Sequence, residues 1–299
     1  MLKKLTVVSV ILITLGFIYW GCSTQSEEEA IRELLEESNY TAEGSMVVDD
    51  TGDISFLNAE FTDSLIPWVK WIRKVKRPVE RNVNINIYGD SAVATITMYL
   101  EGLPPDYGFW VRNVPQSSVV YRRAITDSSV RQVKLVRIRP RHWRIVAVTP
   151  AVIHTVNAYT GMSINEVRLE VPRRNYLFVL NNPTRFLKRE SLPDLRPDDT
   201  VKVTVNINVE DDSGWVFLHR ARRAIGAGQR RMALFKRDQN MFVGTWIIPD
   251  EYDSRPTVRH CAFDLIGFES LFGDSTATYA SYLWIVPYII RNPSDEIPE

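Results

Sequence analysis

The sequence has little cysteine and histidine and no excess of either charge. Two cysteines and four histidines occur among 299 residues, so a scaffold held together by many disulfides is excluded. The 36 Lys and Arg residues equal the 36 Asp and Glu residues, and this balance gives no indication of nucleic-acid binding. Internal repeats and low-complexity tracts are absent, and 45% hydrophobic with 24% charged residues is typical of globular proteins. The composition therefore excludes a disordered chain, a fibrous repeat and a polytopic membrane protein.

The N-terminus carries a targeting segment. Lys3 and Lys4 precede a run of uncharged, mainly apolar positions over residues 5–21, which is the layout of a secretory signal peptide. The run ends in Gly21 and Cys22, and here the segment resembles a bacterial lipoprotein signal. The resemblance implies cleavage before Cys22, acylation of the Cys22 thiol and amine and, because Ser23 is not Asp, sorting to the outer rather than the inner membrane.

The alternative is an uncleaved membrane anchor, since 17 residues over 5–21 are close to the ~20 that span a bilayer. Both interpretations place the rest of the chain outside the cytoplasm, in a bacterial cell envelope. At about 100–200 residues per domain, the length predicts two domains. We expect a signal peptide over 1–21, an α+β domain over 22–150, a linker over 151–163 and a β-sandwich domain over 164–299.

Charge is segregated within the first of these domains. Residues 22–63 contain 12 acids and one base, a net charge of −11, whereas residues 64–150 contain 5 acids and 15 bases, a net charge of +10. These opposite charges predict that the two parts dock on each other. The alternative is a basic face that stays free for an anionic partner.

The first domain begins with helical patterns and continues with strands. Ser26 and Glu29 have the spacing of a capping box, and apolar residues at steps of three and four predict a second helix over 60–76. Alternating residues predict strands over 83–88, 92–100, 117–126, 130–139 and 142–149.

The turn Gly89–Ala92 and the strand Trp143–Val146 resemble the nuclear-transport-factor-like and polyketide-cyclase-like family. The resemblance implies helices packed on a curved antiparallel sheet, a cone that holds an apolar ligand or acid–base residues.

The second domain is predicted to be all β. Valine and isoleucine alternate with polar residues over 201–209, which indicates a half-buried strand. About seven further short strands with turn clusters between them are typical of a β-sandwich. The stretch GDSTATYASY, residues 273–282, resembles a corner of immunoglobulin-like or fibronectin type III-like modules, so we expect an immunoglobulin-like sandwich.

Arginines provide the candidate contact residues. Arg131, Arg137 and Arg139 share one face of a predicted strand, which is either a solvated or internally paired face or an anion-binding one. Trp110, predicted to lie in a loop, is a further candidate ligand contact. A second basic group surrounds Gly226 and Gly228 at a predicted hairpin tip, and comprises Arg220, Arg222, Arg223, Arg230 and Arg231.

Catalytic and metal chemistry receive little support from the sequence. His260 and Cys261 are adjacent on a predicted strand, so their side chains point to opposite faces, and we expect Cys261 to be a buried free thiol. Neither a phosphate-binding loop nor a metal-ligand spacing is present, so we expect no cofactor and no metal.

These observations predict a non-enzymatic, membrane-anchored envelope protein that binds or scaffolds through its surfaces. Its partners are the membrane, through lipid on Cys22, and an anionic lipid, polysaccharide or acidic protein. The alternative is a small-molecule-binding or catalytic cone, isomerase- or cyclase-like, with the sandwich as a docking module.

Overall fold

The structure, a computed structural model, describes residues 26–49, 69–113, 119–156, 161–209, 214–220, 230–248 and 257–291. Within these ranges the chain is mostly β-strand, with two α-helices and three short 3-10 helices. The predicted α+β cone of helices on a curved sheet followed by an immunoglobulin-like sandwich is therefore wrong. The coarser prediction of a β-sandwich is confirmed.

The helical elements are α2 (Glu27–Glu37), α3 (Phe268–Phe272), η1 (Glu43–Ser45), η3 (Pro172–Arg174) and η4 (Arg189–Ser191). The strands are β1 (Val69–Lys74), β2 (Glu80–Tyr88), β3 (Ser91–Gly102), β4 (Gly108–Asn113), β5 (Val120–Arg123), β6 (Ile125–Arg139), β7 (His142–Val148), β8 (Ala151–Thr155), β9 (Ser163–Val171), β10 (Tyr176–Leu180), β11 (Leu187–Lys188), β12 (Asp194–Leu195), β13 (Thr200–Asn208), β14 (Gly214–Arg220), β15 (Arg230–Ala233), β16 (Phe235–Asp238), β17 (Met241–Ile247), β18 (Thr257–Gly267) and β19 (Ser281–Ile290).

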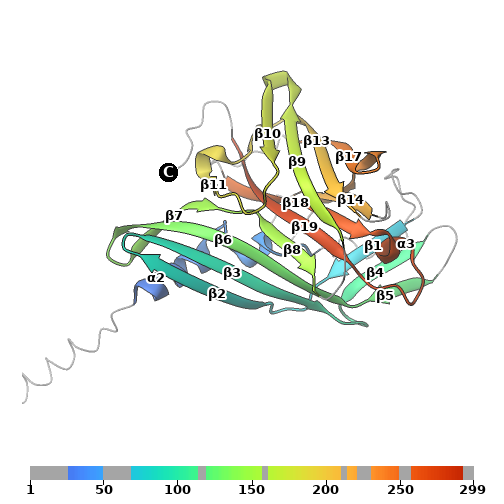
Figure 1. The fold of residues 1–299 in the computed structure, drawn as a ribbon, viewed down its shortest axis with the longest axis horizontal. Coiled ribbons are helices and arrows are strands. Elements are labelled where there is room, and N and C mark those ends of the chain that lie inside the picture. The colour runs from blue at the N-terminus through green and yellow to red at the C-terminus, as the bar shows by residue number, and fades with distance from the viewer. Residues whose placement is uncertain are drawn as a thin grey trace, which may run out of the picture.

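Hydrogen bonds arrange the described strands in three sheets (Figure 1). Sheet A has the order β1-β4-β5, and sheet C has the order β10-β9-β13-β17-β16. Sheet B has 11 strands, and its main path is β11-β7-β6-β8-β19-β18-β14-β15. Strand β6 also pairs with β3, which pairs with β2, and β12 runs parallel to β19. Sheet B therefore continues without a break across the chain position near Pro150.

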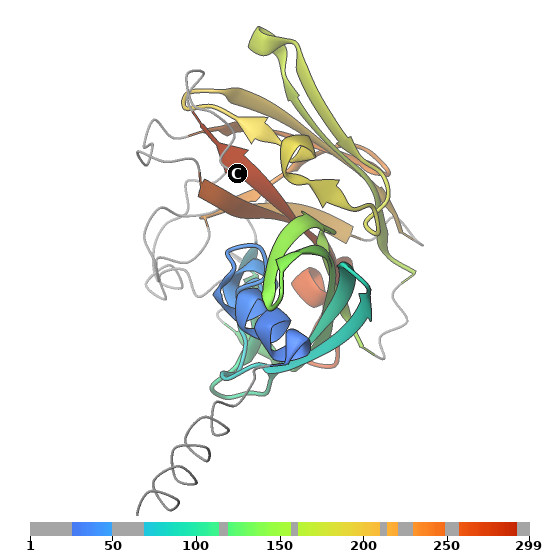
Figure 2. The ribbon, with the colours of Figure 1, turned by 90° about the vertical axis from the view of Figure 1, so that its left-hand side faces the viewer.

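Helix α2 forms where the sequence predicts it. Ser26 accepts a hydrogen bond from the Glu29 amide at 3.0 Å, and the Glu29 carboxylate accepts one from the Ser26 amide at 2.7 Å. This reciprocal pair satisfies two amides that the first helical turn leaves without partners. Ile31 and Leu35 are fully buried in a core beneath the part of sheet B that holds β3 and β6, and Figure 2 shows these strands curving around the helix.

The second predicted helix is wrong. Residues 60–68 lie outside the described residues, and the remainder contains strand β1, which pairs antiparallel with β4. Five consecutive residues of β1, from Val69 to Arg73, are buried. A strand that is covered on both faces shows no clean alternation of apolar and polar residues. Here Val69, Ile72 and Val75 follow one another at steps of three, a spacing that is also typical of a helix.

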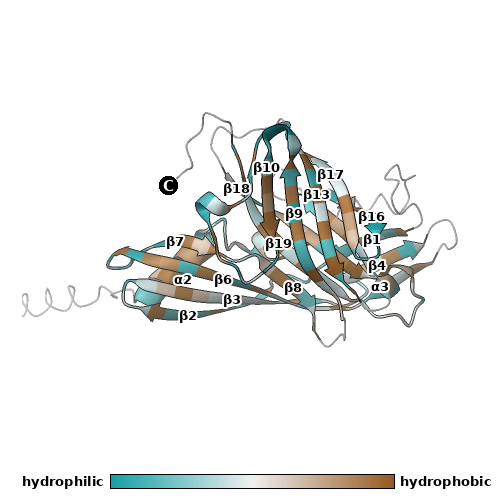
Figure 3. Ribbon diagram, turned by 45° about the horizontal axis from the view of Figure 1, so that its top comes forward, coloured by the Kyte–Doolittle hydropathy of each residue, from teal (hydrophilic) through white to brown (hydrophobic). Residues whose placement is uncertain are grey.

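Sheet C and one face of sheet B form the sandwich. In β13 the residues Val201, Val203, Val205 and Ile207 are buried, as their alternation predicts, and Figure 3 shows the same striping along β9 and β13. In β18, Cys261 and two further odd-numbered residues face this core. The even-numbered residues of β18 face the opposite way, so this part of sheet B is buried on both faces.

No helix in the described part of the chain is long and apolar enough to cross a membrane. The apolar run over 5–21 and the predicted lipidation site Cys22 lie outside the described residues.

Candidate functional site

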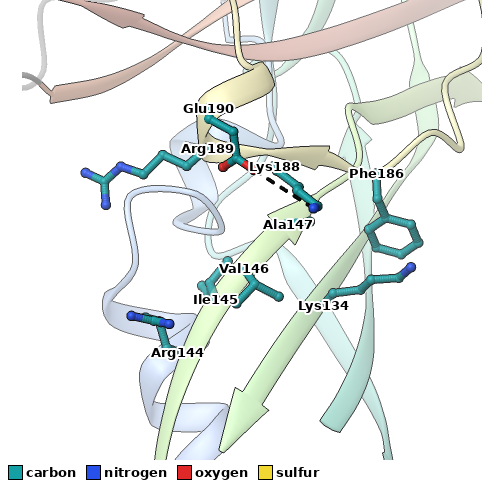
Figure 4. A pocket seen from close by; sticks show the side chains of 9 residues that line it. All are labelled: Lys134, Arg144, Ile145, Val146, Ala147, Phe186, Lys188, Arg189 and Glu190. Atoms are coloured by element: carbon teal, nitrogen blue, oxygen red, sulfur yellow. Dashed lines mark ion pairs between the residues drawn. The ribbon is translucent and has the colours of Figure 1, made fainter. Parts of the chain in front are cut away.

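A cleft of about 570 Å³ lies between strands β6 and β7 and the segment that contains β11 and η4. Its volume is within the range of small-molecule sites. Figure 4 shows long basic side chains, the cationic wall, spread around Ile145 and Val146, which with Ala147 form an apolar floor. The residues that line it are Lys134, Arg144, Ile145, Val146, Ala147, Phe186, Lys188, Arg189 and Glu190.

Strand alternation and a short ladder place these side chains. Val133 and Leu135 are buried in the core that contains α2, so Lys134 between them points to the opposite, outer face. Leu187 is buried and pairs with Val148, which fixes the segment 186–190 against β7. The Lys134 ammonium nitrogen lies 4.2 Å from the centre of the Phe186 ring, a cation–π contact that joins the two walls.

The charge of the cleft is strongly positive. Four cationic side chains and one carboxylate line it, so its formal charge is 4 − 1 = +3. The carboxylate, Glu190, lies 4.0 Å from the Lys188 ammonium, and both side chains are more than half exposed. Because exposed ion pairs of this kind are weak, the cleft keeps its capacity to attract an anion. An anion that carries an apolar group matches both the wall and the floor.

The predicted arginine row does not line this cleft. Arg131 is fully buried, and its guanidinium donates to the Tyr40 carbonyl, to Ser45 Oγ at 3.0 Å and to the Ile285 carbonyl at 3.1 Å. Arg137 donates to Asp90. Arg139 is exposed and lies 3.0 Å from a ring nitrogen of His142.

Arg131 lies on the face of β6 that covers the core around α2. Arg137 and Arg139 lie on the same face, but near the end of the strand, where the core no longer covers it.

The remaining predicted contacts are dispersed. Trp110 is half-buried in strand β4, not in a loop, and pairs with Ile72 and Arg122. Arg231 donates to the Trp71 carbonyl at 3.0 Å, and its guanidinium lies 3.8 Å from the centre of the Trp71 ring. Arg220 and Arg230 pair through their backbones where β14 and β15 meet. Arg222 and Arg223 lie outside the described residues.

The described part of the acidic block, residues 26–49, contacts the basic block as predicted. Arg77 pairs with Glu43 and lies 3.5 Å from Asp49, and Arg137 lies 3.5 Å from Glu27. Each of these pairs joins a carboxylate of the early segment to an arginine of the later one.

A buried ionic cluster joins sheet A to sheet B. The Arg73 guanidinium lies 2.9 Å from one oxygen of Asp264 and donates to the other at 3.2 Å, while a ring nitrogen of His219 lies 2.8 Å from Asp264. All three side chains are at most 2% exposed. Burial opposes ionisation of Asp264, but Arg73 and His219 outweigh it and hold the pKa of that carboxyl below its ordinary value.

Asp127 is the second carboxyl of this cluster, and its environment is different. Burial raises its pKa to about 6, although the charge of Arg73 and the hydroxyls of Thr155 and Tyr279 oppose that shift. One of its oxygens is buried and finds no hydrogen-bond partner among the described residues. Thr155 and Tyr279 also line a smaller hollow of about 350 Å³, so the cluster approaches the surface on this side.

Sequence reasoning missed this cluster. Asp127, Ser128 and Ser129 suggest a turn between two strands, whereas the structure carries β6 straight through them. The one available sign was Asp264 itself, the single acid of its strand, with the apolar residues Phe263 and Leu265 on either side. The prediction that Cys261 is a buried free thiol is confirmed. Its burial raises the pKa of the thiol, which leaves little reactive thiolate.

Comparisons of the chain with family models, with curated proteins and with solved structures found no match. Among the described residues, no group of three or more His, Cys, Asp and Glu side chains is placed to hold a metal ion. The geometry of the chain itself is therefore the basis for assigning a function.

Proposed function

We propose that this chain is a membrane-anchored binding protein of a bacterial cell envelope, and that the basic cleft is where it binds a small amphipathic anion. The observation that carries the proposal is that one cleft contains four cations, a single exposed carboxylate and an apolar floor. Guanidinium and ammonium groups recognise phosphate and carboxylate, and the floor suits an adjoining apolar group.

The location of the cleft supports binding without chemistry. Its lining contains lysine, arginine and apolar side chains and one carboxylate, Glu190, which is more than half exposed beside Lys188. The buried His219–Asp264 pair belongs to another part of the molecule. A general acid or base must reach the proton that it transfers. His219 and Asp264 are each 0% exposed, so this pair serves the interior.

Isothermal titration of the purified full chain with hexyl phosphate, hexanol and inorganic phosphate tests the cleft. We expect hexyl phosphate to bind most tightly, and its affinity to fall as salt screens the charges. The double variant Lys134→Ala/Arg144→Ala should weaken binding at least about tenfold, since a hydrogen bond to a charged group contributes roughly 1.5–3 kcal/mol.

The matched control is Arg168→Ala/Lys202→Ala, which removes two partly exposed cations from sheet C. It should leave the affinity unchanged. Equal binding of hexanol and hexyl phosphate, or equal affinity of the two double variants, contradicts the proposal. Mass spectrometry of ligands retained from an envelope lipid extract then identifies the natural anion.

The anchor requires its own test. Mature protein should carry acyl chains on Cys22, and because each buried methylene contributes about 0.8 kcal/mol, two or three chains make release very slow. Cys22→Ala should leave the membrane fraction in high salt, whereas the control Cys261→Ala should remain in it. Membrane retention of Cys22→Ala in high salt shows that lipid on this residue is not what holds the chain.

A further inference from the structure

One end of the molecule combines the start of α2 with two strand turns. We name it the anchor-proximal tip and define it by Ser26–Glu27, by residues 87–90 at the β2–β3 turn and by residues 137–142 at the β6–β7 turn. Figure 1 shows the two turns and the first turn of α2 at the same end, and Figure 2 views this end directly.

Polar contacts hold the three parts of the tip together. The Glu27 carboxylate accepts hydrogen bonds from the Arg141 amide at 3.2 Å and from the Trp143 indole at 2.8 Å. Arg137 lies 3.5 Å from Glu27 and donates to Asp90 at 2.9 Å. The Arg137 amide also donates to the Asp90 carbonyl at 2.8 Å. The start of the helix is therefore fixed to both turns.

The short chain between Cys22 and Ser26 limits how far the tip can lie from the membrane. Four residue steps separate Cys22 from Ser26, and an extended chain spans at most about 3.3–3.6 Å per residue. If Cys22 sits at a bilayer surface, Ser26 lies within roughly 14 Å of it. The uncleaved alternative gives nearly the same limit, because the apolar run ends at residue 21.

Apolar side chains point outward from the tip. Tyr88 is 67% exposed, Ile138 is 58% exposed and Ile87 is 40% exposed. The first two belong to different turns, and both turns are tied together by the Arg137–Asp90 contact. Tyrosine suits the boundary between water and hydrocarbon, since its ring is apolar and its hydroxyl is polar.

The charges of the tip also fit a bilayer surface. Its acids are engaged within the protein: Glu27 and Asp90 bind Arg137, Glu28 pairs with Arg32 at 2.6 Å, and Glu29 caps the helix. Arg139 and Arg141 are exposed, and among the described residues neither guanidinium has a carboxylate within ion-pair distance. These two arginines are available to anionic headgroups.

We infer that the anchor-proximal tip lies against the bilayer that holds the anchor, with Tyr88 and Ile138 in the headgroup layer and Arg139 and Arg141 on anionic lipid phosphates. The inference rests on the proposed anchoring of the chain. It adds an orientation: the long axis of sheet B leaves the membrane from this end, and the opposite end of the molecule projects away.

Site-directed fluorescence on the full, anchored chain tests this orientation. Tyr88→Cys and the control Leu177→Cys each place an environment-sensitive dye on an exposed site, because Leu177 is 53% exposed and lies on β10 of sheet C. Cys261 is fully buried, so it is not labelled in the folded protein. The labelled proteins are reconstituted in vesicles of phosphatidylcholine with phosphatidylglycerol.

We expect the dye at position 88 to shift to the blue and to lose severalfold in iodide quenching on reconstitution, while the dye at position 177 does not change. Ile138→Cys should behave like Tyr88→Cys and provides a second site if one variant folds poorly. Flotation of the vesicles separates the two hypotheses. Protein that floats but leaves position 88 as open to iodide as position 177 overturns the orientation alone, whereas protein that does not float overturns the anchoring and the orientation together.

Discussion

Arg73 and Arg131 are both buried inside this protein, yet their positive charges are balanced in different ways. Arg73 faces the carboxylate of Asp264 at 2.9 Å. Burial alone lowers the pKa of an arginine, but Asp264 reverses this effect and raises the pKa of Arg73 above its ordinary value. Arg131 is bonded by two carbonyls and one hydroxyl, and burial lowers its pKa to about 9.

The difference between these arginines shows what each one holds in place. Arg73 joins strand β1 of sheet A to β18 of sheet B through opposite charges. Arg131 joins β6 to β19 and to the segment that follows α2, through carbonyl dipoles that belong to the backbone. A carboxylate partner makes a site whose loss leaves an uncompensated charge, whereas carbonyl partners make a site that loses only hydrogen bonds when the arginine is removed.

The largest expected effect follows removal of the carboxylate. Asp264→Asn breaks the buried ion pair of Arg73 by removing the carboxylate 2.9 Å away, and breaking a buried pair typically costs about 3–5 kcal/mol. Denaturant unfolding, followed by tryptophan fluorescence at pH 7, should show the free energy of unfolding fall by that amount. The control Asp194→Asn removes an acid from a partly exposed pair with Arg291 and should cost far less; equal losses contradict the account of Arg73.

The second prediction concerns pH and separates the two carboxyls of the cluster. The pKa of Asp127 is about 6 when folded, against an ordinary value of 3.8, so the folded state binds the proton more tightly. The stability that this group contributes is therefore present below about pH 4 and is lost as pH rises to about 6. The difference between the folded and the ordinary pKa corresponds to about 3 kcal/mol of unfolding free energy. Asp127→Asn should abolish this fall between pH 4 and pH 6.

Asp264 acts with the opposite sign in a lower pH window. The folded pKa of Asp264 is depressed, so its contribution to stability is present above its unfolded pKa and is lost as pH falls through the folded pKa. This loss occurs below the pH range in which Asp127 acts. A stability profile of Asp127→Asn that still declines from pH 4 to pH 6 contradicts the assignment.

The third prediction tests Arg131 directly. Arg131→Met removes the buried charge together with its cost of desolvation, but leaves the Tyr40 and Ile285 carbonyls without this donor. We expect a loss of about 1–3 kcal/mol, smaller than for Asp264→Asn, in the same unfolding measurement. Arg131→Lys serves as the comparison, because it keeps a charge and loses the planar fork. A loss for Arg131→Met that exceeds the loss for Asp264→Asn reverses the proposed contrast.

Substitutions in the basic cleft should have the smallest effect on stability. Lys188→Ala and Arg144→Ala change exposed cations, and surface substitutions of this kind usually alter stability by less than about 0.5 kcal/mol. Thermal melting should therefore be nearly unchanged, while anion affinity declines. A large change in melting temperature indicates that these cations support the fold and do not serve a ligand.

Local patterns in the sequence were sufficient for part of this structure. The capping box at Ser26, the alternation of β13 and the burial of Cys261 depend on neighbours within a few residues, so the sequence predicts them. The buried charges, in contrast, depend on residues that are far apart in the sequence. Arg73 and Asp264 are 191 positions apart, and no periodicity indicates that they meet.

The candidate cleft could not be predicted for the same reason, because its two walls come from distant parts of the sequence. Lys134 and Arg144 belong to a basic cluster that is visible in the sequence, but the opposite wall comes from residues 186–190, beyond the predicted domain boundary. Arg131, Arg137 and Arg139 share a face, as alternation requires, but the first of them lies over the core. Alternation identifies a common face and does not say whether that face is covered.

The position of β19 has a consequence for biosynthesis. This strand, the last one in the described part of the chain, completes sheet B from within, since it is hydrogen-bonded to β8 on one side and to β18 on the other. A polypeptide that is synthesised from its N-terminus cannot close the sheet until residue 290 has left the ribosome. A chain truncated before Ser281 exposes two open strand edges, which makes it a template for aggregation and a substrate for quality-control proteases.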